Sequence, residues 1–419
     1  MITHPALLAL TLGGLILGIL KLEKNPACLR LFHYLPAPFW CYFLPMVLST
    51  LGVLPEKSPV YSFLTTYLLS GCLILLLLNV NVPSILRLGP AALGALAVGS
   101  LGIGLGAVGA FAIFGRWLPP ETWKGVGALS ASWTGGSANM LAVKEGLQTP
   151  EAVFAPMVIV DTLITYLWMG IMIALAVFQD RWDRWVKADR SALDDAAQRL
   201  QNAELGTRSD TQRSLASRVA SSEDGNSHED INLPRSALRA PRWIHALWLI
   251  GGSMLIGAAC LALGRRLPTG GGVLNPAGWA FLIVTLIGIL LSLTPASRLE
   301  KYGASRWGYA CLYLLLAAMG SKARLQYILQ APLLIVMAAV WVSMHAFLLA
   351  AYGYLRRVPM FFLAAASQAN IGGTASAPIV AGVYQPRLAS IGLLLAVAVN
   401  VVGTYIGYLI GHLCSLLHP

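Results

Sequence analysis

Uninterrupted apolar stretches, each about as long as a lipid bilayer is thick, dominate this chain. They fall at about 5–22, 36–54, 59–80, 88–115, 152–178, 243–264, 274–294, 306–320, 331–355 and 387–417. A helix of about 20 apolar residues spans the hydrocarbon core of a membrane. Hydrophobic residues make up 57% of the chain and charged residues only 11%, whereas a soluble protein carries roughly a quarter charged residues. These features predict an all-α polytopic membrane protein.

A glycine-rich polar segment occurs twice among these apolar stretches. Residues 130–146 align with residues 367–382 when Gly135-Gly136 is set on Gly372-Gly373. In lipid, backbone that leaves helical geometry must be buried in protein or line a watery cavity. Interrupted hydrophobic segments at matching places in two halves are the best sequence indication of a transporter site. We therefore predict two structural repeats of six elements each, in which residues 122–146 and 359–383 form discontinuous or re-entrant elements.

The predicted repeats occupy residues 1–178 and 242–419, and a polar segment, residues 179–241, separates them. This segment is rich in Ser, Asp, Arg, Gln and Asn, so it lacks the apolar residues that a core requires. We predict a disordered cytoplasmic linker that begins with a short interfacial helix around Trp182 and Trp185.

The number of membrane crossings decides whether the repeats are parallel or inverted. Six crossings per half would make them parallel. If each Gly/Ser segment dips in and returns, five crossings would make them inverted. With a cytoplasmic linker, only the second arrangement puts Lys21, Lys24, Arg30 and Arg87 on the cytoplasmic side, as the positive-inside rule favours. We therefore predict inverted repeats.

The formal net charge of +11 gives no support for nucleic-acid binding. The segment from Asp180 to Arg242 is neutral, so the basic excess lies on the short loops of the membrane part, as orientation by basic flanks requires. The cysteines are scattered through apolar stretches without metal-ligand spacing, which is typical of small buried hydrophobic residues. No metal site and no cofactor are predicted. The first apolar run is interpreted as a retained span, since no signal-peptide cleavage site follows it.

Asp161 is the most informative single residue. It lies about ten residues into the apolar stretch 152–178 and has no charged neighbour in sequence. A carboxylate at that depth costs several kcal/mol unless it is paired, hydrated or protonated, and is a functional candidate by default. We predict a proton or Na⁺ site there. The alternative is a structural hydrogen-bond acceptor. Asn400 lies close to the matching position of the second half.

The two Gly/Ser segments supply the other candidate binding residues. Unpaired backbone groups and helix ends at mid-membrane offer positive poles to a carboxylate and carbonyl poles to a cation. The alternative is close helix packing through small residues, which explains the glycines but not the added amides. The predicted solute and ion site comprises Ser130, Ser132, Thr134, Gly135, Gly136, Ser137, Asn139, Asp161, Ser367, Gln368, Asn370, Gly372, Gly373, Thr374, Ser376 and Asn400.

Three further polar residues receive structural interpretations. Lys144 and Glu145 end the first Gly/Ser segment, and we expect a solvated interfacial pair because the second segment has no equivalent. His345 lies within the apolar stretch 331–355. A lone histidine there can relay protons, but a hydrogen bond to a neighbouring helix is the commoner role.

Three motifs connect the chain with a known family. They are Ser-Trp-Thr-Gly-Gly-Ser-Ala-Asn-Met-Leu-Ala-Val-Lys-Glu, Val-Asp-Thr-Leu-Ile-Thr-Tyr-Leu-Trp-Met and Ala-Asn-Ile-Gly-Gly-Thr-Ala-Ser-Ala-Pro. At these motifs the chain resembles the YjcL-like family of uncharacterised membrane proteins (domain of unknown function 819). The wider kin of that family resemble the cation:proton antiporter and anion transporter group. The resemblance implies inverted repeats, an elevator-type secondary transporter, and a match between Asp161 and an ion-binding aspartate. Val160 departs from that pattern, because a second acidic residue is common there.

These observations predict an Na⁺- or H⁺-coupled secondary transporter of a small polar, anionic solute such as an amino acid, short peptide or organic acid. It would lie in the bacterial cytoplasmic membrane, as a monomer or a homodimer. The first alternative is a cation/proton antiporter without an organic substrate. The second is a membrane-embedded enzyme that uses Ser137 or Ser376 with His345. We expect no enzyme, because nothing in the spacing assembles a nucleophile, base and orienting group.

Overall fold

The computed structural model describes residues 2, 4–28, 31–32, 35–78, 80–189, 191, 193, 242–269 and 275–417. Within these residues the chain is helical, without a β-strand. In this described part of the chain, six helices are long and apolar enough to cross a membrane, or up to eight if each of two bent helix pairs forms one span. Large apolar side chains also face outward, since Leu10, Trp248 and Phe347 are each more than 70% exposed. The chain is a polytopic membrane protein, whose outward apolar surface is suited to lipid.

In the described part of the first half, the chain forms the following α-helices before the polar segment. Each predicted apolar stretch contains a helix, and a π-helical turn at Leu64–Leu68 joins α4 to α5. The helices are α1 (Pro5–Glu23), α3 (Ala37–Thr50), α4 (Pro59–Phe63), α5 (Leu69–Leu77), α6 (Val82–Leu86), α7 (Gly89–Phe114), α8 (Thr122–Trp133), α9 (Gly136–Gly146) and α10 (Glu151–Leu175).

The polar segment begins with the short helix α11 (Gln179–Val186), where a short helix is predicted. Most of the predicted linker, residues 194–241, lies outside the described residues. The second half contains α13 (Arg242–Gly264), α14 (Pro276–Ser292), α15 (Ala304–Gly320), α16 (Ala331–Arg356), α17 (Met360–Tyr384), α18 (Ala389–Asn400) and α19 (Gly403–Leu417).

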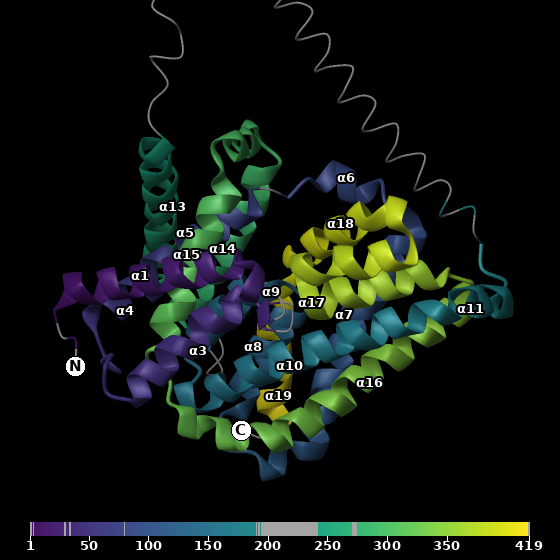
Figure 1. Ribbon diagram of the computed structural model, residues 1–419, viewed down its shortest axis with the longest axis horizontal. Helices are drawn as coiled ribbons and strands as arrows, with labels where there is room; N and C mark the ends of the chain where they lie inside the picture. The colour runs from purple at the N-terminus through teal and green to yellow at the C-terminus, as the bar shows by residue number, and fades with distance from the viewer. Residues whose placement is uncertain are drawn as a thin grey trace, which may run out of the picture.

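The helices form two groups (Figure 1). The first bundle contains α1, α3, α4, α5, α13, α14 and α15, in which α15 packs on α3 and α5, and α13 packs on α14 and α5. The second bundle contains α7, α8, α9, α10, α16, α17, α18 and α19, in which α16 packs on α7, α17 on α18, and α19 on α8. Each half of the chain therefore contributes its early helices to the first bundle and its later helices to the second.

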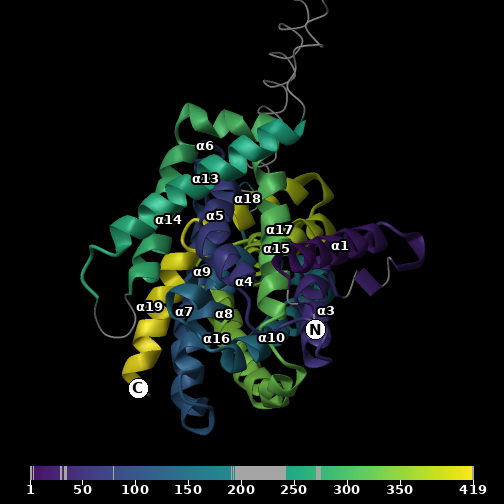
Figure 2. The same cartoon turned by 90° about the vertical axis from the view of Figure 1, so that its left-hand side faces the viewer.

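The two bundles meet along α9. This short helix packs against α5 and α14 of the first bundle, and against α8 and α19 of the second. Figure 2 views the molecule from the side of the first bundle, whose helices α5 and α15 stand in front of the second bundle. Ala92 and Ala95 of α7 lie in one buried apolar cluster with Ala365 and Ala366 of α17. Small side chains let these helices approach closely in a membrane.

Candidate functional site

The first Gly/Ser segment is interrupted at Thr134 and Gly135, between α8 and α9. Gly135 has an extended φ of −174°, and Gly136 has a φ of +77°. The second value lies in the left-handed region that favours glycine. The Gly-Gly pair therefore ends α8 and starts α9 at the same place. As a result, the N-terminus of α9 lies inside the protein.

The second Gly/Ser segment is kinked at the matching position. Within α17, Gly373 has φ +63° and ψ −154°, a backbone conformation that is essentially restricted to glycine. No atom lies within 4 Å of the position that a Cβ on Gly373 would occupy. Backbone geometry alone therefore requires glycine here.

A third interruption separates α18 from α19, which are bent by 54°. The predicted last span over 387–417 is therefore bent within its length, and the bend itself was not predicted. Asn400 ends α18, two turn residues follow, and Gly403 begins α19. The missed signal was an asparagine followed closely by a glycine, both of which favour helix ends. The apolar pair Val401-Val402 hid it.

One crossing of broken helices is closed by direct contact. A Cβ on Gly403 would lie 2.5 Å from the Cα of Gly135 and 2.7 Å from the carbonyl oxygen of Thr134, so the two backbones touch. The Asn139 amide donates to the carbonyl oxygens of Gly135 (2.5 Å) and Asn400 (3.1 Å), and Thr404 donates to Asn139 Oδ1 (2.5 Å). With its amide oriented to satisfy its neighbours, Asn400 donates to the carbonyls of Gly135 (3.0 Å) and Ala396 (3.1 Å). We call this the locked crossing.

A second crossing joins α10 to the kink of α17 and holds Asp161. Ser132 of α8 donates to Asp161 Oδ2 (3.1 Å), and Thr165 donates to the carbonyl oxygen of Ile371 (3.0 Å). Asp161 and Thr165 both face a cavity. We call this the open crossing.

That cavity, of about 410 Å³, lies between the two bundles where the interrupted helices meet. The second bundle supplies both Gly/Ser breaks, Asp161 and Asn400. The first bundle supplies the end of α1, the start of α3, and one face of α15. Tyr309 of α15 and Thr374 of α17 are linked by a hydroxyl–hydroxyl hydrogen bond of 3.3 Å across the cavity's two walls. Its volume is within the range of roughly 300–1,000 Å³ that is typical of small-molecule sites.

The charged residues that line the cavity are both acidic. They are Glu23, at the end of α1, and Asp161. The N-terminus of α9 also opens onto the cavity at Gly136, and it carries the positive end of a helix dipole. The cavity therefore presents two carboxyl groups to a cationic group and a partial positive charge to an anionic one.

The structure divides the predicted site residues into two groups. One group lines the cavity: Ser132, Gly135, Gly136, Ser137, Asp161, Gly372, Gly373, Thr374 and Asn400. The members of the other group are buried, form hydrogen bonds within the protein and do not line this cavity: Ser130, Thr134, Asn139, Ser367, Gln368, Asn370 and Ser376. In this second group, the packing interpretation describes the contacts better than the binding one.

Ser367 belongs to a chain of hydrogen bonds that joins four helices. His345 Nδ1 lies 2.9 Å from the carbonyl oxygen of Gly99, so it must carry the proton. His345 Nε2 then accepts from Ser367 Oγ (2.9 Å), which in turn accepts from Trp168 Nε1 (2.9 Å). His345 thus bonds to neighbouring helices, as expected for a lone intramembrane histidine. Its partner is Ser367 and neither of the serines, Ser137 and Ser376, named in the enzyme alternative.

Sequence reasoning missed the wall that the first bundle contributes. Glu23, Tyr309 and Tyr313 line the cavity, and they lie in helices of the first bundle that contain no Gly/Ser segment. Glu23 ends an apolar span, where an acidic residue has the usual interpretation of a solvated helix end. No feature of the sequence brings these residues to Asp161, because only long-range packing does so.

The expectation of a solvated Lys144–Glu145 pair is wrong. The Lys144 side chain is buried, and its ammonium contacts Glu145 (2.8 Å) and Glu151 (2.7 Å). Lys322, in the turn after α15, lies 3.9 Å from Glu145. Burial lowers the pKa of Lys322, the charge of Lys144 lowers it further, and Glu145 opposes both. This ion cluster joins α9 and α10 to the first bundle, a role that the adjacent pair in the sequence did not indicate.

Comparison with known proteins finds two similarities. The family model described as "Protein of unknown function (DUF819)" matches residues 6–222 and 216–417. The chain is also 26% identical over 379 residues to the "Uncharacterized membrane protein YjcL" of Bacillus subtilis (strain 168), covering 88% of this chain and 87% of that protein. The family predicted from the three motifs is confirmed, while its relation to the cation:proton antiporter group stays a prediction. Neither description assigns an activity.

Proposed function

We propose that this chain, which belongs to the DUF819 family and is a membrane protein, is an ion-coupled secondary active transporter of a small polar solute. One observation carries the proposal: both Gly/Ser breaks open onto one polar cavity, of about 410 Å³, between two helix bundles. Interrupted helices that meet at a shared polar site are the recurring design of transporter binding sites.

The division into two bundles supports an elevator-type mechanism. Most of the polar lining belongs to the second bundle, and the first bundle closes the cavity with Glu23, Pro38, Tyr309 and Tyr313. Movement of the second bundle along that wall would carry the site from one side of the membrane to the other. In this proposal the two halves are inverted repeats, the membrane is the bacterial cytoplasmic membrane, and the linker is cytoplasmic.

The charges of the cavity favour one class among the predicted solutes. A purely anionic organic acid would meet the carboxylates of Glu23 and Asp161, and like charges repel. An amino acid or short peptide carries an ammonium group that suits these carboxylates and a carboxylate that suits the N-terminus of α9. We therefore propose a zwitterionic amino acid or peptide as the solute.

Asp161 is the proposed coupling group. Ser132 donates to one of its oxygens, and the cavity gives it access to an ion from water. It would bind Na⁺ or a proton together with the solute. Antiport of a cation against protons without an organic solute is the second candidate, since the same two acidic residues could bind a cation alone.

Uptake by the purified full-length protein in proteoliposomes tests this proposal. A radiolabelled amino-acid mixture is supplied under an inward Na⁺ gradient and, separately, an inward proton gradient. One gradient should drive accumulation, and Asp161→Asn should reduce it at least about tenfold, the effect of one lost interaction with a charged group. The control is Asp189→Asn, an exposed carboxyl beyond α11, which should leave uptake unchanged.

The same vesicles separate the two candidates. Proton efflux driven by an external cation, without solute uptake and sensitive to Asp161→Asn, would favour the antiporter. Equal fluxes in wild type and Asp161→Asn under every gradient would contradict the role of Asp161 in both.

A further inference from the structure

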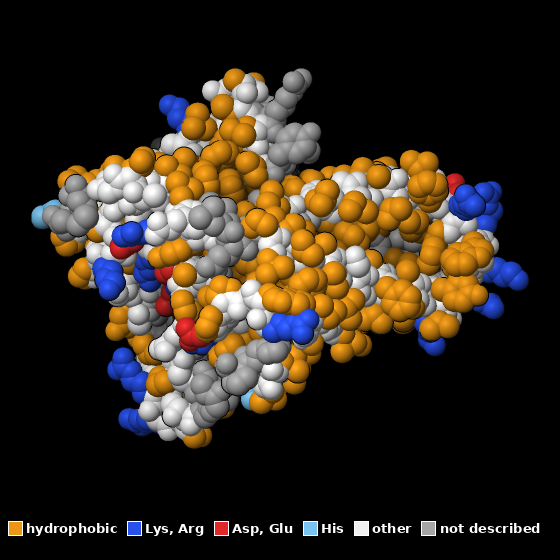
Figure 3. Space-filling model, turned by 90° about the horizontal axis from the view of Figure 1, so that it is seen from below, with side chains coloured by type: hydrophobic (Ala, Val, Ile, Leu, Met, Phe, Trp, Pro, Cys, Tyr) orange, Lys and Arg blue, Asp and Glu red, His pale blue; other side chains and the backbone are white. Residues whose placement is uncertain are grey.

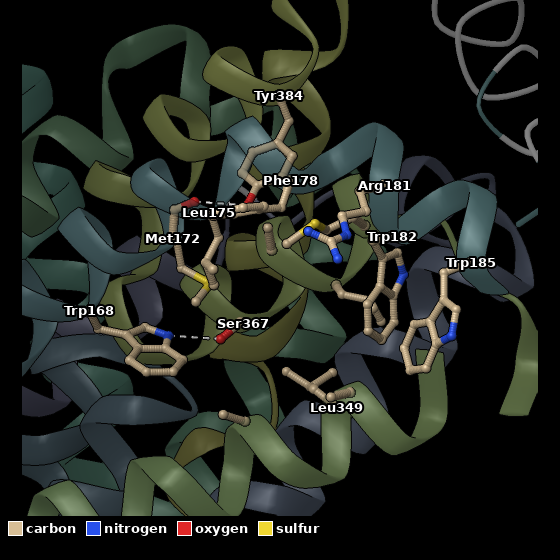
Figure 4. Close-up of a pocket in the computed structure, with 15 residues that line it drawn as sticks. Trp168, Met172, Leu175, Phe178, Arg181, Trp182, Trp185, Leu349, Ser367 and Tyr384 are labelled. Carbon is tan, nitrogen blue, oxygen red and sulfur yellow. Dashed lines mark hydrogen bonds between the residues drawn. The ribbon is translucent and has the colours of Figure 1, made fainter. Parts of the chain in front are cut away.

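A second pocket, of about 550 Å³, lies in the second bundle between α10, α11, α16 and α17. Its walls are almost entirely apolar and aromatic. Among the labelled side chains in Figure 4, Trp168, Met172 and Leu349 lie around Ser367, and Trp182 and Trp185 of α11 lie on the side of the pocket opposite Trp168. None of its lining residues belongs to the cavity at the open crossing, and the proposed transport function does not use it.

The helix α11 closes one end of this pocket. Two hydrogen bonds fix it to the segment between α16 and α17. Trp182 Nε1 donates to the carbonyl oxygen of Val358 (3.2 Å), and the backbone N–H of Met360 donates to Asp183 Oδ1 (2.9 Å). Trp185 packs against Tyr354 with ring centroids 5.1 Å apart. Tryptophan and tyrosine gather at the level of lipid headgroups. The placement of α11 therefore indicates that this end of the pocket lies at the membrane surface.

Basic side chains surround the same end. Arg181, Arg184 and Lys187 are exposed on or next to α11, and Arg356 and Arg357 are exposed where α16 ends. The backbone N–H of Asp189 donates to the carbonyl oxygen of Arg357 (3.1 Å), which brings these two groups together. Figure 3 shows Lys and Arg side chains gathered at the tip of the molecule where α11 lies, next to an apolar flank. Basic pockets at the ends of membrane helices bind anionic lipid headgroups.

Arg181 connects the charge to the pocket. It belongs to the lining, and its guanidinium is directed toward the other labelled side chains of the pocket rather than away from them (Figure 4). The polar atoms deeper inside are already bonded, since Ser367 contacts Trp168 and His345, and Tyr384 donates to the carbonyl oxygen of Met172 (2.8 Å). The pocket therefore offers one cation at its mouth and apolar surface behind it.

We propose that this pocket binds an anionic phospholipid. Its phosphate lies at Arg181, and an acyl chain occupies the apolar space between α10 and α16. A guanidinium forms charge-assisted hydrogen bonds with phosphate oxygens, and the apolar walls match a hydrocarbon chain. A soluble phosphate ester would gain the first contact and leave the apolar walls unfilled, which is why the lipid is the occupant.

Native mass spectrometry of the detergent-purified full-length protein tests the site. Dioleoyl phosphatidylglycerol and dioleoyl phosphatidylcholine are titrated separately, because they share acyl chains and differ in net charge. Phosphatidylglycerol should bind more tightly, and Arg181→Gln should weaken it about fivefold, as expected for one basic residue at an anionic headgroup. Arg266→Gln, at the end of α13 in the first bundle, is the matched control and should change nothing.

A second variant tests the acyl-chain position. Ala350 lines the pocket from an exposed position on α16, so Ala350→Trp fills space without disturbing buried packing. It should reduce binding of phosphatidylglycerol at least about fivefold, whereas inorganic phosphate at equal concentration should not compete. Equal binding of both lipids, insensitivity to both variants, or competition by inorganic phosphate would each overturn the proposal.

Discussion

The locked crossing and the open crossing contain similar polar residues, but these residues have different surroundings. At the locked crossing, Gly135 and Gly403 bring two backbones into contact, and Asn139, Asn400 and Thr404 satisfy the freed carbonyl groups. At the open crossing, Asp161 has one serine donor and faces the cavity. A polar group with every bond satisfied by protein stabilises the fold, whereas one that is left facing a cavity is available to a ligand. Polar residues of neighbouring helices therefore divide into those that protein contacts satisfy and those that a ligand could contact.

We expect the largest difference in stability when the carboxylate of one crossing and the amide of the other are exchanged. Asn400→Asp would replace an amide donor by a carboxylate that faces the carbonyls of Gly135 and Ala396. We expect a loss of about 2–3 kcal/mol in the free energy of unfolding at pH 8, since a donor is lost and a charge is left near two acceptors.

The reciprocal change, Asp161→Asn, should cost less than about 1 kcal/mol, because Ser132 can donate to an amide oxygen as well. Urea unfolding of both variants in the same detergent checks the pair. If Asp161→Asn were the more destabilising variant, the roles of the two crossings would be reversed.

Close packing at the locked crossing predicts a smaller effect of a single methyl group. Gly403→Ala would place a Cβ against the backbone of Thr134 and Gly135, and overpacking of this kind costs about 1–3 kcal/mol. Gly170→Ala on α10 is the control, because no atom lies within 4 Å of its Cβ position. Thermal unfolding should show a lower Tm for Gly403→Ala, and an unchanged or higher Tm for Gly170→Ala, since alanine favours helix. Equal Tm values would show that the locked crossing can spread apart freely.

The open crossing requires its glycine for a different reason. Gly373→Ala meets no steric obstacle, but its φ of +63° and ψ of −154° are unfavourable for alanine. We expect a cost of about 1–2 kcal/mol, and a straighter α17 that narrows the cavity. Gly251→Ala on α13, also without neighbours within 4 Å, is the control. Comparison of unfolding and uptake should show that Gly373→Ala lowers both. If Gly373→Ala were as stable and as active as the wild type, the kink would not be required for either property.

The smallest predicted effect concerns the hydrogen bond between Thr165 of α10 and Ile371, next to the kink of α17. Thr165→Val removes the donor to the carbonyl oxygen of Ile371 and should cost about 1 kcal/mol. Thr162→Val removes only a bond to Val158 within α10, so its effect should be near zero. Urea unfolding of the two variants measures the difference directly. An equal response would mean that this hydrogen bond adds nothing to the contact between α10 and α17.

The deviations from the sequence-based predictions share a cause. Helix positions and the two Gly/Ser breaks depend on neighbours in the chain, so apolar length, Gly pairs and amides were sufficient to predict them. The break before Gly403 was missed because Val401-Val402 continues the apolar pattern. The burial of Lys144 was missed because its second carboxylate partner, Glu151, lies on the next helix.

The sequence by itself determined that this protein is helical and crosses a membrane, because the length and polarity of each segment fix its transfer into lipid. It also determined where the backbone leaves helical geometry, because glycine and polar side chains act locally. Only the tertiary structure decided which polar groups are satisfied and which face a cavity. That distinction depends on contacts between segments far apart in the chain, such as Gly135 with Gly403 and Tyr309 with Thr374, and no local property encodes them.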